Sequence, residues 1–174
     1  MASPDLEHWN ERRWVHGSVL GPTSIERMRT CAADLAEGAG VGPIDIGLPL
    51  RTLFSSARLK REASLLLGRE ACLGGVVVPT ATEGIEVPPG RLAAMLSLSV
   101  SRDGACTVVE IEADSGHDPV PVALPVGAVV WVAGACSGAW PSDGESGPVV
   151  VAAYGPVDVA SPGSGCRELQ QTSS

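Results

Sequence analysis

Residues 127–156 read GAVVWVAGACSGAWPSDGESGPVVVAAYGP, and this stretch decides the class of fold. Two apolar runs rich in Val and Ala, 128–135 and 147–155, flank a polar segment that has neither a basic residue nor a histidine. Short runs that are apolar on both faces are typical of strands in the centre of a sheet or facing the inside of a barrel. We therefore expect two central β-strands joined as a hairpin.

Earlier segments of the chain also have the two-residue period of β-strands. Apolar residues recur through 71–79 and 91–100, and the sequence SRDGA at 101–105 is typical of a hairpin turn. Prolines interrupt the segment 119–127, and a proline cannot donate a hydrogen bond to a neighbouring strand. That segment is therefore predicted to be an edge or connecting strand.

One predicted strand, 106–113, has a polar face and an apolar face. Val109 and Ile111 alternate with Glu110 and Glu112. Because successive side chains of a strand point to opposite faces, the two carboxylates share one face. We interpret this face as solvent-exposed rather than as a catalytic pair.

Two helices are expected before these strands. Glu26 stands three residues after Thr23, which is a capping-box pattern, and apolar residues follow at helical spacing. This pattern predicts a helix at about 22–37. In SSARLKREASLLLG a serine precedes a second helical stripe that ends at a glycine, which predicts a helix at about 55–67.

The order of these segments indicates one domain. No internal repeat or linker divides residues 1–160, in which a short extended segment, 12–21, comes first. The pattern predicts a mainly β protein of the α+β class, with two N-terminal helices packed on an antiparallel sandwich or barrel. Residues 161–174 have the polar, Gly- and Ser-containing composition of a disordered tail.

The composition excludes two classes of partner. The chain has a formal net charge of -8 and only 3% aromatic residues, so the sequence shows no evidence of the positive face or the stacking surface that nucleic acids need. No apolar run approaches the length of a membrane span. We therefore expect neither nucleic acid nor a membrane as a partner.

The cysteines indicate a reducing compartment. Their number is odd and their spacing is wide, without a Cys-x-x-Cys pair, at Cys31, Cys72, Cys106, Cys136 and Cys166. This usage favours reduced thiols over a disulfide framework or a zinc site. Because the N-terminus has no apolar signal region either, a cytoplasmic protein is expected.

Three segments resemble the phytanoyl-CoA dioxygenase-like family of iron and 2-oxoglutarate oxygenases. Residues 12–38 resemble the opening extended segment and helix of that family. Residues 56–78 are similar to its second helix, which ends in Leu-Leu-Gly before the first barrel strand, and 120–156 resemble its last strands. The resemblance implies an antiparallel double-stranded β-helix, a small barrel of the cupin type.

The same resemblance identifies where this chain departs from the family. Its members bind iron through a His-x-Asp pair and a later His, and hold 2-oxoglutarate partly through an Arg. At the place of the His-x-Asp pair this chain has PTATEGIEVPPG, residues 79–90, in which Glu83 and Glu86 are the only possible metal ligands. Cys136-Ser137 stands at the place of the later His, and Gly147 stands at the place of the Arg. We therefore expect no metal and no cofactor.

Three residues are candidates for acid–base catalysis. His117 precedes Asp118 and could act as a general base, although an exposed turn before Pro119 is the favoured explanation of the pair. His16 lies on the predicted extended segment, where a structural role is the alternative. Glu83 lies beside the predicted mouth of the barrel, where an apolar environment can raise a carboxyl pKa; a solvated loop carboxylate is the alternative.

Four residues are candidates for binding substrate. The scarce aromatic residues Trp140 and Tyr154 are predicted near the interior of the barrel, where they could form the wall of a ligand site. Glu86 and Ser137 stand at the places of the lost iron ligands.

These observations favour one function and leave two alternatives. The leading hypothesis is a cofactor-independent, non-redox cyclase or isomerase that folds a small hydrophobic metabolite in an apolar cavity, in specialised biosynthesis. A homodimer is its candidate assembly. The first alternative is a non-catalytic partner or regulatory subunit of a true oxygenase. The second is a metalloenzyme that uses Glu83, His117 or His16 as unorthodox ligands.

Overall fold

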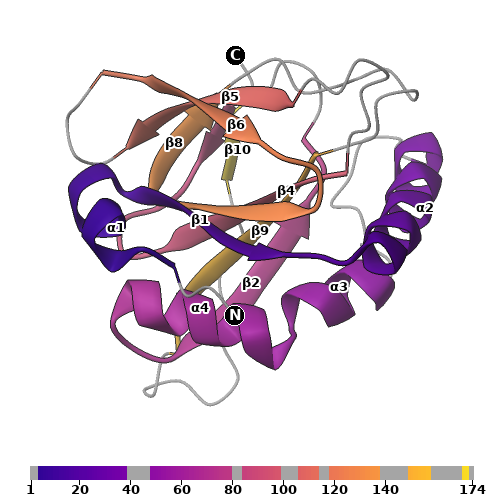
Figure 1. Cartoon of the computed structure of the whole chain (residues 1–174), viewed down its shortest axis with the longest axis horizontal. Coiled ribbons are helices and arrows are strands. Elements are labelled where there is room, and N and C mark those ends of the chain that lie inside the picture. Colours follow the sequence, from indigo (N-terminus) through magenta and orange to yellow (C-terminus); the bar gives the residue numbers. More distant parts are fainter. Residues whose placement is uncertain are drawn as a thin grey trace.

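A computed structural model of the chain describes residues 4–38, 48–79, 84–98, 106–113, 118–137, 149–157 and 170–172. Within these residues, two β-sheets and a group of helices form successive layers (Figure 1). The helices are α1 (Leu6–Arg12), α2 (Pro22–Gly38), α3 (Leu48–Phe54) and α4 (Ala57–Leu67).

Every strand pairing in the two sheets is antiparallel. Sheet A has the order β1 (Trp14–Val19), β7 (Ala128–Val132), β4 (Leu92–Ser97), β9 (Val149–Pro156) and β2 (Ala71–Val77). Sheet B has the order β10 (Gln170–Thr172), β3 (Gly84–Glu86), β8 (Gly134–Ser137), β5 (Thr107–Ala113) and β6 (Val120–Leu124). Sheet A lies between sheet B and helix α4 (Figure 1).

The central strands of sheet A contribute side chains to two separate hydrophobic cores. Leu96 and Trp131 belong to an outer core that sheet A shares with the helices. Met95 and Val130, their neighbours in sequence, belong to an inner core between the two sheets. Because successive residues of a strand point to opposite faces, both faces of these strands must be apolar. The predicted central strands are confirmed, as is the edge position of the proline-containing strand β6.

The expected hairpin in the opening stretch is wrong. β7 lies in sheet A, and after the single residue Ala133 the chain continues as β8 in sheet B. Gly134 permits this change of sheet, because its φ of 120° is a conformation that side-chain-bearing residues rarely adopt. β8 pairs with β3 and β5, whereas β9 pairs with β4 and β2, so the two strands lie in different sheets.

Both predicted helices are confirmed, with one change at the start of the first. Helix α2 begins at Pro22, and the carbonyl of Gly21 accepts hydrogen bonds from the backbone N–H groups of Ser24 and Ile25. Thr23 is therefore inside the helix and not at its N-cap. Pro at the first helical position loses no hydrogen bond, because that N–H has no partner in a helix. No helix among the described residues is long and apolar enough to cross a membrane.

Four elements were not predicted from the sequence. They are α1, α3, β3 and β10. α1 is one of the short helices, and its N-cap Asp5 accepts hydrogen bonds from the backbone N–H groups of Glu7 and His8. β10 falls inside the segment expected to be a disordered tail, and its residues 170–172 pair with β3. The expectation of disorder is thus wrong for those three residues.

A buried carboxylate joins the helix layer to the sheet. Glu62 of α4 is only 7% exposed. Its Oε2 accepts hydrogen bonds from the backbone N–H of Ser18 at 3.1 Å and from the indole Nε1 of Trp131 at 2.9 Å. The hydroxyl of Ser18 donates to Oε1. One side chain therefore links α4 to β1 and β7.

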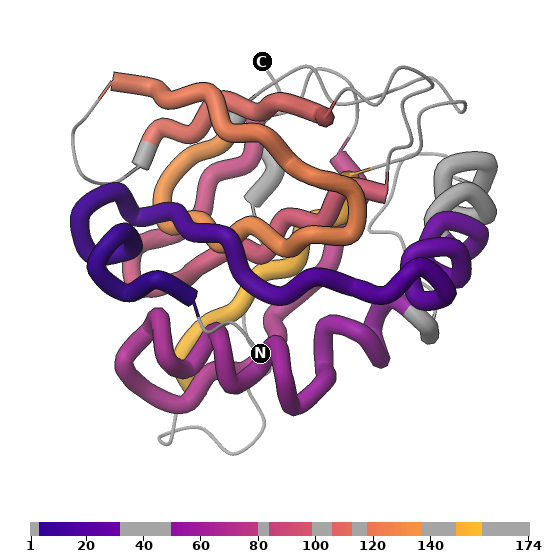
Figure 2. Tube along the Cα trace, in the orientation of Figure 1, coloured from indigo at the N-terminus to yellow at the C-terminus, as the bar shows by residue number. Residues whose placement is uncertain are grey.

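Gly17 makes room for this network. A Cβ atom at Gly17 would lie 2.6 Å from Oε2 of Glu62 and would collide with the indole of Trp131. The strand can approach the carboxylate this closely only because glycine has no side chain. β1 then lies beside β7, although the two are far apart in the sequence (Figure 2).

We predict that Glu62→Ala lowers the free energy of unfolding by about 3 kcal/mol, because it leaves the N–H groups of Ser18 and Trp131 buried without an acceptor. Ser18→Ala removes one donor and keeps the carboxylate, so its expected cost is about 1 kcal/mol. Urea unfolding measures both values. Glu70→Ala, at an exposed carboxylate, is the control. A Glu62→Ala variant as stable as this control would contradict the proposed role of the network.

Candidate functional site

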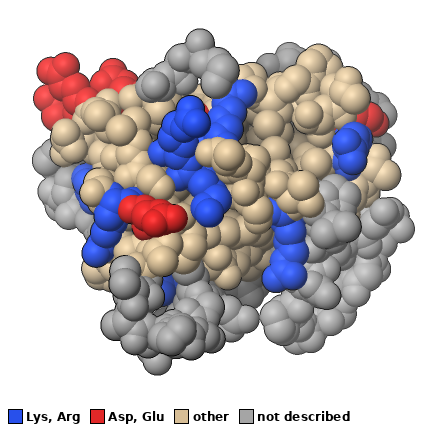
Figure 3. All heavy atoms as spheres, turned by 90° about the horizontal axis from the view of Figure 1, so that it is seen from below, with Lys and Arg blue, Asp and Glu red and all other residues tan. Residues whose placement is uncertain are grey.

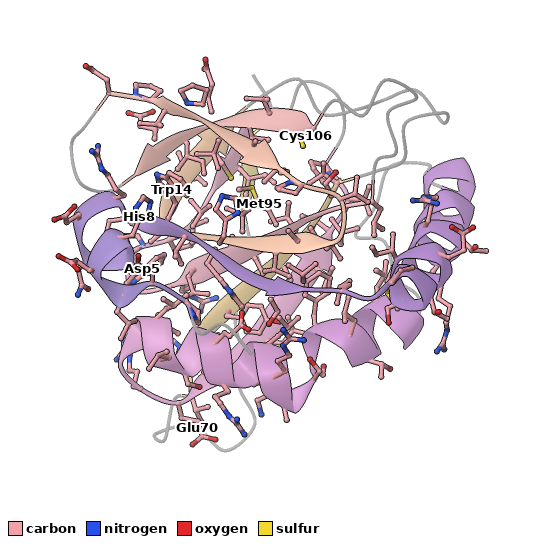
Figure 4. All side chains as sticks on the ribbon, viewed as in Figure 1. Asp5, His8, Trp14, Glu70, Met95 and Cys106 are labelled. Carbon is pink, nitrogen blue, oxygen red and sulfur yellow. The ribbon has the colours of Figure 1, made fainter. Side chains whose placement is uncertain are left out.

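The inner core occupies the region where the family resemblance implies an iron site. β3 and β8 are neighbours there, and Ile85 is the pairing partner of Cys136. Three side chains there are only 1–3% exposed: Ile85, Val87 and Cys136. They pack between the sheets with other apolar side chains, among them Met95 (Figure 4). The described side chains that face one another in this region are therefore apolar or, in the case of Cys136, a buried thiol.

These side chains do not fit a ferrous ion. Iron sites of this kind need imidazole and carboxylate ligands, and neither Ile85 nor Val87 has a donor atom. Burial raises the pKa of the Cys136 thiol from 9.0 to about 12, whereas a thiol binds a metal as the thiolate. The described residues also contain no group of three or more His, Cys, Asp or Glu side chains placed to hold a metal ion.

Where the structure describes them, the predicted site residues are divided between the two sheets. His16 and Tyr154 belong to sheet A, whereas Glu86 and Ser137 lie on the paired strands β3 and β8 of sheet B. His16 is exposed on β1, the edge strand of sheet A, and Glu86 is exposed on β3, whose neighbouring residues Ile85 and Val87 face the inner core. Ser137 ends β8. Glu83, His117 and Trp140 lie outside the described residues.

Tyr154 lies on the opposite side of sheet A from the expected place. We expected it near the barrel interior, but it belongs to the outer core, where its ring packs edge-on against Trp131 with centroids 5.1 Å apart. Its hydroxyl donates a 2.6 Å hydrogen bond to the carbonyl of Phe54. Burial, and then the negative charge of Glu62, raise the pKa of this phenol. The side chain therefore joins β9 to α3 in its neutral form.

Sequence reasoning missed a group of rings around Trp14. The rings of His8 and His16 both contact Trp14 edge-on, with centroid separations of 4.5 Å and 5.7 Å. Figure 4 shows His8 on α1 close to Trp14 on β1. His8 Nε2 and Trp14 Nε1 are buried and have no hydrogen-bond partner within the described part of the chain. An acceptor placed beside them would therefore gain hydrogen bonds that the protein itself does not make.

The buried Glu62 was missed as well, although the sequence contains a signal for it. Glu62 stands three residues after Leu59 and four before Leu66, on the same helical stripe, and both leucines are buried. A charged residue inside an apolar stripe must find hydrogen-bond partners when the helix packs. The adjacent basic residues made Glu62 resemble part of a solvated face.

The expectation of reduced thiols is wrong for Cys72. Cys72 is disulfide-bonded, whereas Cys31, Cys106 and Cys136 are free. Spacing along the chain does not reveal which sulfur atoms meet in space. The disulfide also weakens the argument for a reducing compartment, which rested on the cysteines.

Comparisons with known proteins identify the fold. No protein-family model matches the sequence, and no curated protein matches it. Similar solved structures include AviO1 from Streptomyces viridochromogenes Tue57, at 16% identity and a TM-score of 0.62, with 93% of this chain and 99% of that chain covered. The non-heme alpha ketoglutarate dependent epimerase SnoN of nogalamycin biosynthesis matches at 16% identity and a TM-score of 0.62, covering 95% and 91%.

A third structure has the same arrangement. The non-heme alpha ketoglutarate dependent carbocyclase SnoK, also from nogalamycin biosynthesis, matches at 16% identity and a TM-score of 0.62, covering 95% of this chain and 92% of that chain. At this level of identity the likeness shows the fold alone. The predicted double-stranded β-helix is confirmed, while membership of the phytanoyl-CoA dioxygenase-like family stays a prediction.

We predict that Cys136 makes the protein less stable at alkaline pH. Because burial raises its pKa to about 12, the thiol ionises in the unfolded chain near pH 9 while it stays neutral in the fold. The free energy of unfolding should therefore fall above pH 9, by up to about 1.4 kcal/mol per pH unit from this group. Urea unfolding at pH 8, 9 and 10 measures the slope.

Cys136→Ala should flatten this decline between pH 9 and 10. Val109→Ala, in the same inner core, shortens an apolar side chain without removing a titratable group and should keep the slope of the unaltered protein. An identical slope in all three proteins would show that the buried thiol does not cause the decline.

Proposed function

We propose that this chain is a metal-independent cyclase or isomerase that acts on a small hydrophobic metabolite in natural-product biosynthesis. The observation that carries the proposal is the burial of the apolar Ile85 and Val87 on either side of the exposed Glu86, together with the neutral thiol of Cys136 at the place implied for the later histidine. A fold of the oxygenase type whose described residues form no group of three ligating side chains can still bind, orient and desolvate a substrate. Reactions that rearrange bonds without oxidation need no more than this and a proton-transfer group.

The ring group around Trp14 is the best candidate for proton transfer. His8 and His16 contact the same indole ring, and a histidine is the side chain best suited to act as an acid and a base near neutral pH. The buried Nε1 of Trp14 and Nε2 of His8 would bind an acceptor oxygen of the substrate. The exposed ring of His16 would then meet the substrate from the solvent side.

Proteins of similar fold support a rearrangement reaction. SnoN is an epimerase and SnoK is a carbocyclase, and both come from the biosynthesis of one natural product. Both are alpha ketoglutarate dependent. We propose the same kind of reaction for this chain, a rearrangement, but without that cofactor.

A second candidate function has its own supporting observation. The side chains of the inner core are almost completely buried from β3 to β9, which leaves little room for a ligand among the described residues. A closed core of this kind would suit a non-catalytic partner that stabilises or regulates a true oxygenase. The two experiments below separate this candidate from the leading one.

We predict that the purified protein binds no iron stoichiometrically and does not consume 2-oxoglutarate. The protein is incubated anaerobically with Fe(II) and 2-oxoglutarate, desalted and analysed for iron, and succinate is measured after admission of air. The expected result follows from the neutral thiol of Cys136 at the place implied for the later histidine, and from the lack of a group of three ligating side chains among the described residues. Stoichiometric iron together with succinate formation would overturn the metal-independent proposal.

We also predict that the substrate and the product have the same elemental composition. Cyclisation or isomerisation conserves mass, so a producing strain without this chain should accumulate a compound of unchanged exact mass and different retention time. The purified protein should convert that compound in the presence of EDTA, and the double variant His8→Asn with His16→Asn should lose most of this activity. Arg12→Gln, an exposed change on α1, is the matched control.

A different result would favour the second candidate. If the accumulated compound lacks an oxygen atom or has two additional hydrogen atoms, the missing step is an oxidation. In that case the chain would serve an oxygenase rather than catalyse a rearrangement.

A further inference from the structure

The helix layer carries a concentration of positive charge that the composition does not reveal. Figure 3 shows Lys and Arg side chains gathered on the face that is seen from below the view of Figure 1. Exposed cations stand along α3, α4 and the turn that follows them: Arg51, Arg58, Lys60, Arg61 and Arg69. We call the surface formed by these five residues the basic face.

Few carboxylates oppose these cations locally. Residues 48–71 contain only two acidic residues, Glu62, which is buried and bound to Ser18 and Trp131, and the exposed Glu70. The whole chain nevertheless has a formal net charge of -8. The rest of the sequence is therefore strongly acidic, and the charge of the molecule is unevenly distributed.

Several of the cations are available to a partner. Lys60, Arg61 and Arg69 form no ion pair with any residue that the structure describes. The guanidinium Nε of Arg58 is 3.9 Å from Oε1 of Glu62, and its side chain is still 43% exposed. Their position on a helix packed against sheet A fixes the spacing of Lys60 and Arg61 before any partner arrives.

The basic face also has the shape and an apolar contact that suit a protein partner. A shallow hollow of about 380 Å³ is lined by Lys60, Arg61, Glu70 and small residues of α4 and its flanks. Leu65, on the outer side of the same helix, is 44% exposed. Protein interfaces combine arginines and a few apolar side chains in this way.

We propose that the basic face is the docking surface for an acidic protein, with Lys60 and Arg61 at its centre and Leu65 as its apolar contact. The cations are spread over an open helix face and do not converge on one small anion. An extended polyanion such as a nucleic acid would also meet the acidic remainder of the chain, whereas a folded protein would meet only this face. The inference does not depend on the proposed function, because a catalyst and a regulatory subunit both could use it.

The test uses a fluorescein-labelled peptide of repeated Glu-Glu-Leu-Glu units as a stand-in for an acidic protein surface. Its binding to the full chain is measured by fluorescence anisotropy between low and physiological salt. Binding should weaken as salt rises, and the charge reversal Lys60→Glu with Arg61→Glu should weaken it by roughly tenfold or more. Leu65→Ala should weaken binding severalfold without changing the salt dependence.

A matched pair of substitutions distinguishes the basic face from diffuse attraction. Arg12→Glu with Arg27→Glu changes the net charge equally at exposed positions on α1 and α2 and should leave binding within about twofold. Lys60→Gln with Arg61→Gln replaces the charge reversal if that variant does not fold. Equal losses in the two charge-reversal pairs would overturn the proposal. Tighter binding to a DNA duplex, inorganic phosphate or phosphatidylglycerol vesicles than to the peptide would overturn it as well.

Discussion

The carboxylate of Glu62 is the constraint on which the arrangement of the layers depends. A buried carboxylate is unfavourable unless donors surround it, and here the donors come from two strands of sheet A, through Ser18 and Trp131. Hydrophobic burial alone would allow α4 to slide over the sheet, because apolar contacts have little directionality. The hydrogen bonds permit one position, and the absence of a side chain at Gly17 lets the strand reach it. The network therefore supplies specificity that the apolar cores around it do not.

The division of sheet A between two cores explains both the ease of predicting the fold and the difficulty of locating a site. Strands whose side chains pack in both the outer and the inner core must be apolar throughout. Their sequences therefore reveal that they lie in the centre of a sheet. The same uniformity hides which face a given residue occupies. Tyr154 was expected inside the barrel, and the register of β9 places it under the helices. A shift of one residue would have reversed that outcome.

The sequence predicts long elements well and short ones poorly, for a physical reason. Helices α2 and α4 and the central strands contain enough residues for a period to emerge. β3 and β10 have three residues each, and tertiary pairing rather than local pattern makes them strands. Two further contacts could not be predicted from the sequence pattern: the disulfide of Cys72 and the edge-on contacts of His8 and His16 with Trp14. The sequence did show, by resemblance, that Cys136 stands where a later histidine is implied, and the structure adds that this thiol is buried.

The strand order of sheet A has a consequence for folding of the chain during synthesis on the ribosome. β1 pairs with β7, so that Trp14 meets Val132, and β2 pairs with β9, so that Ala71 meets Pro156. The first pairing cannot form until residue 132 has left the exit tunnel, and the second cannot form until residue 156 has left it. Such long-range contacts make folding slow. During that interval the apolar strands β2 and β4 have no partner strand, and both of their faces are exposed to solvent. The strand order thus leaves β2 and β4 unpaired for longer than a sheet in which each strand pairs with its neighbour in the sequence.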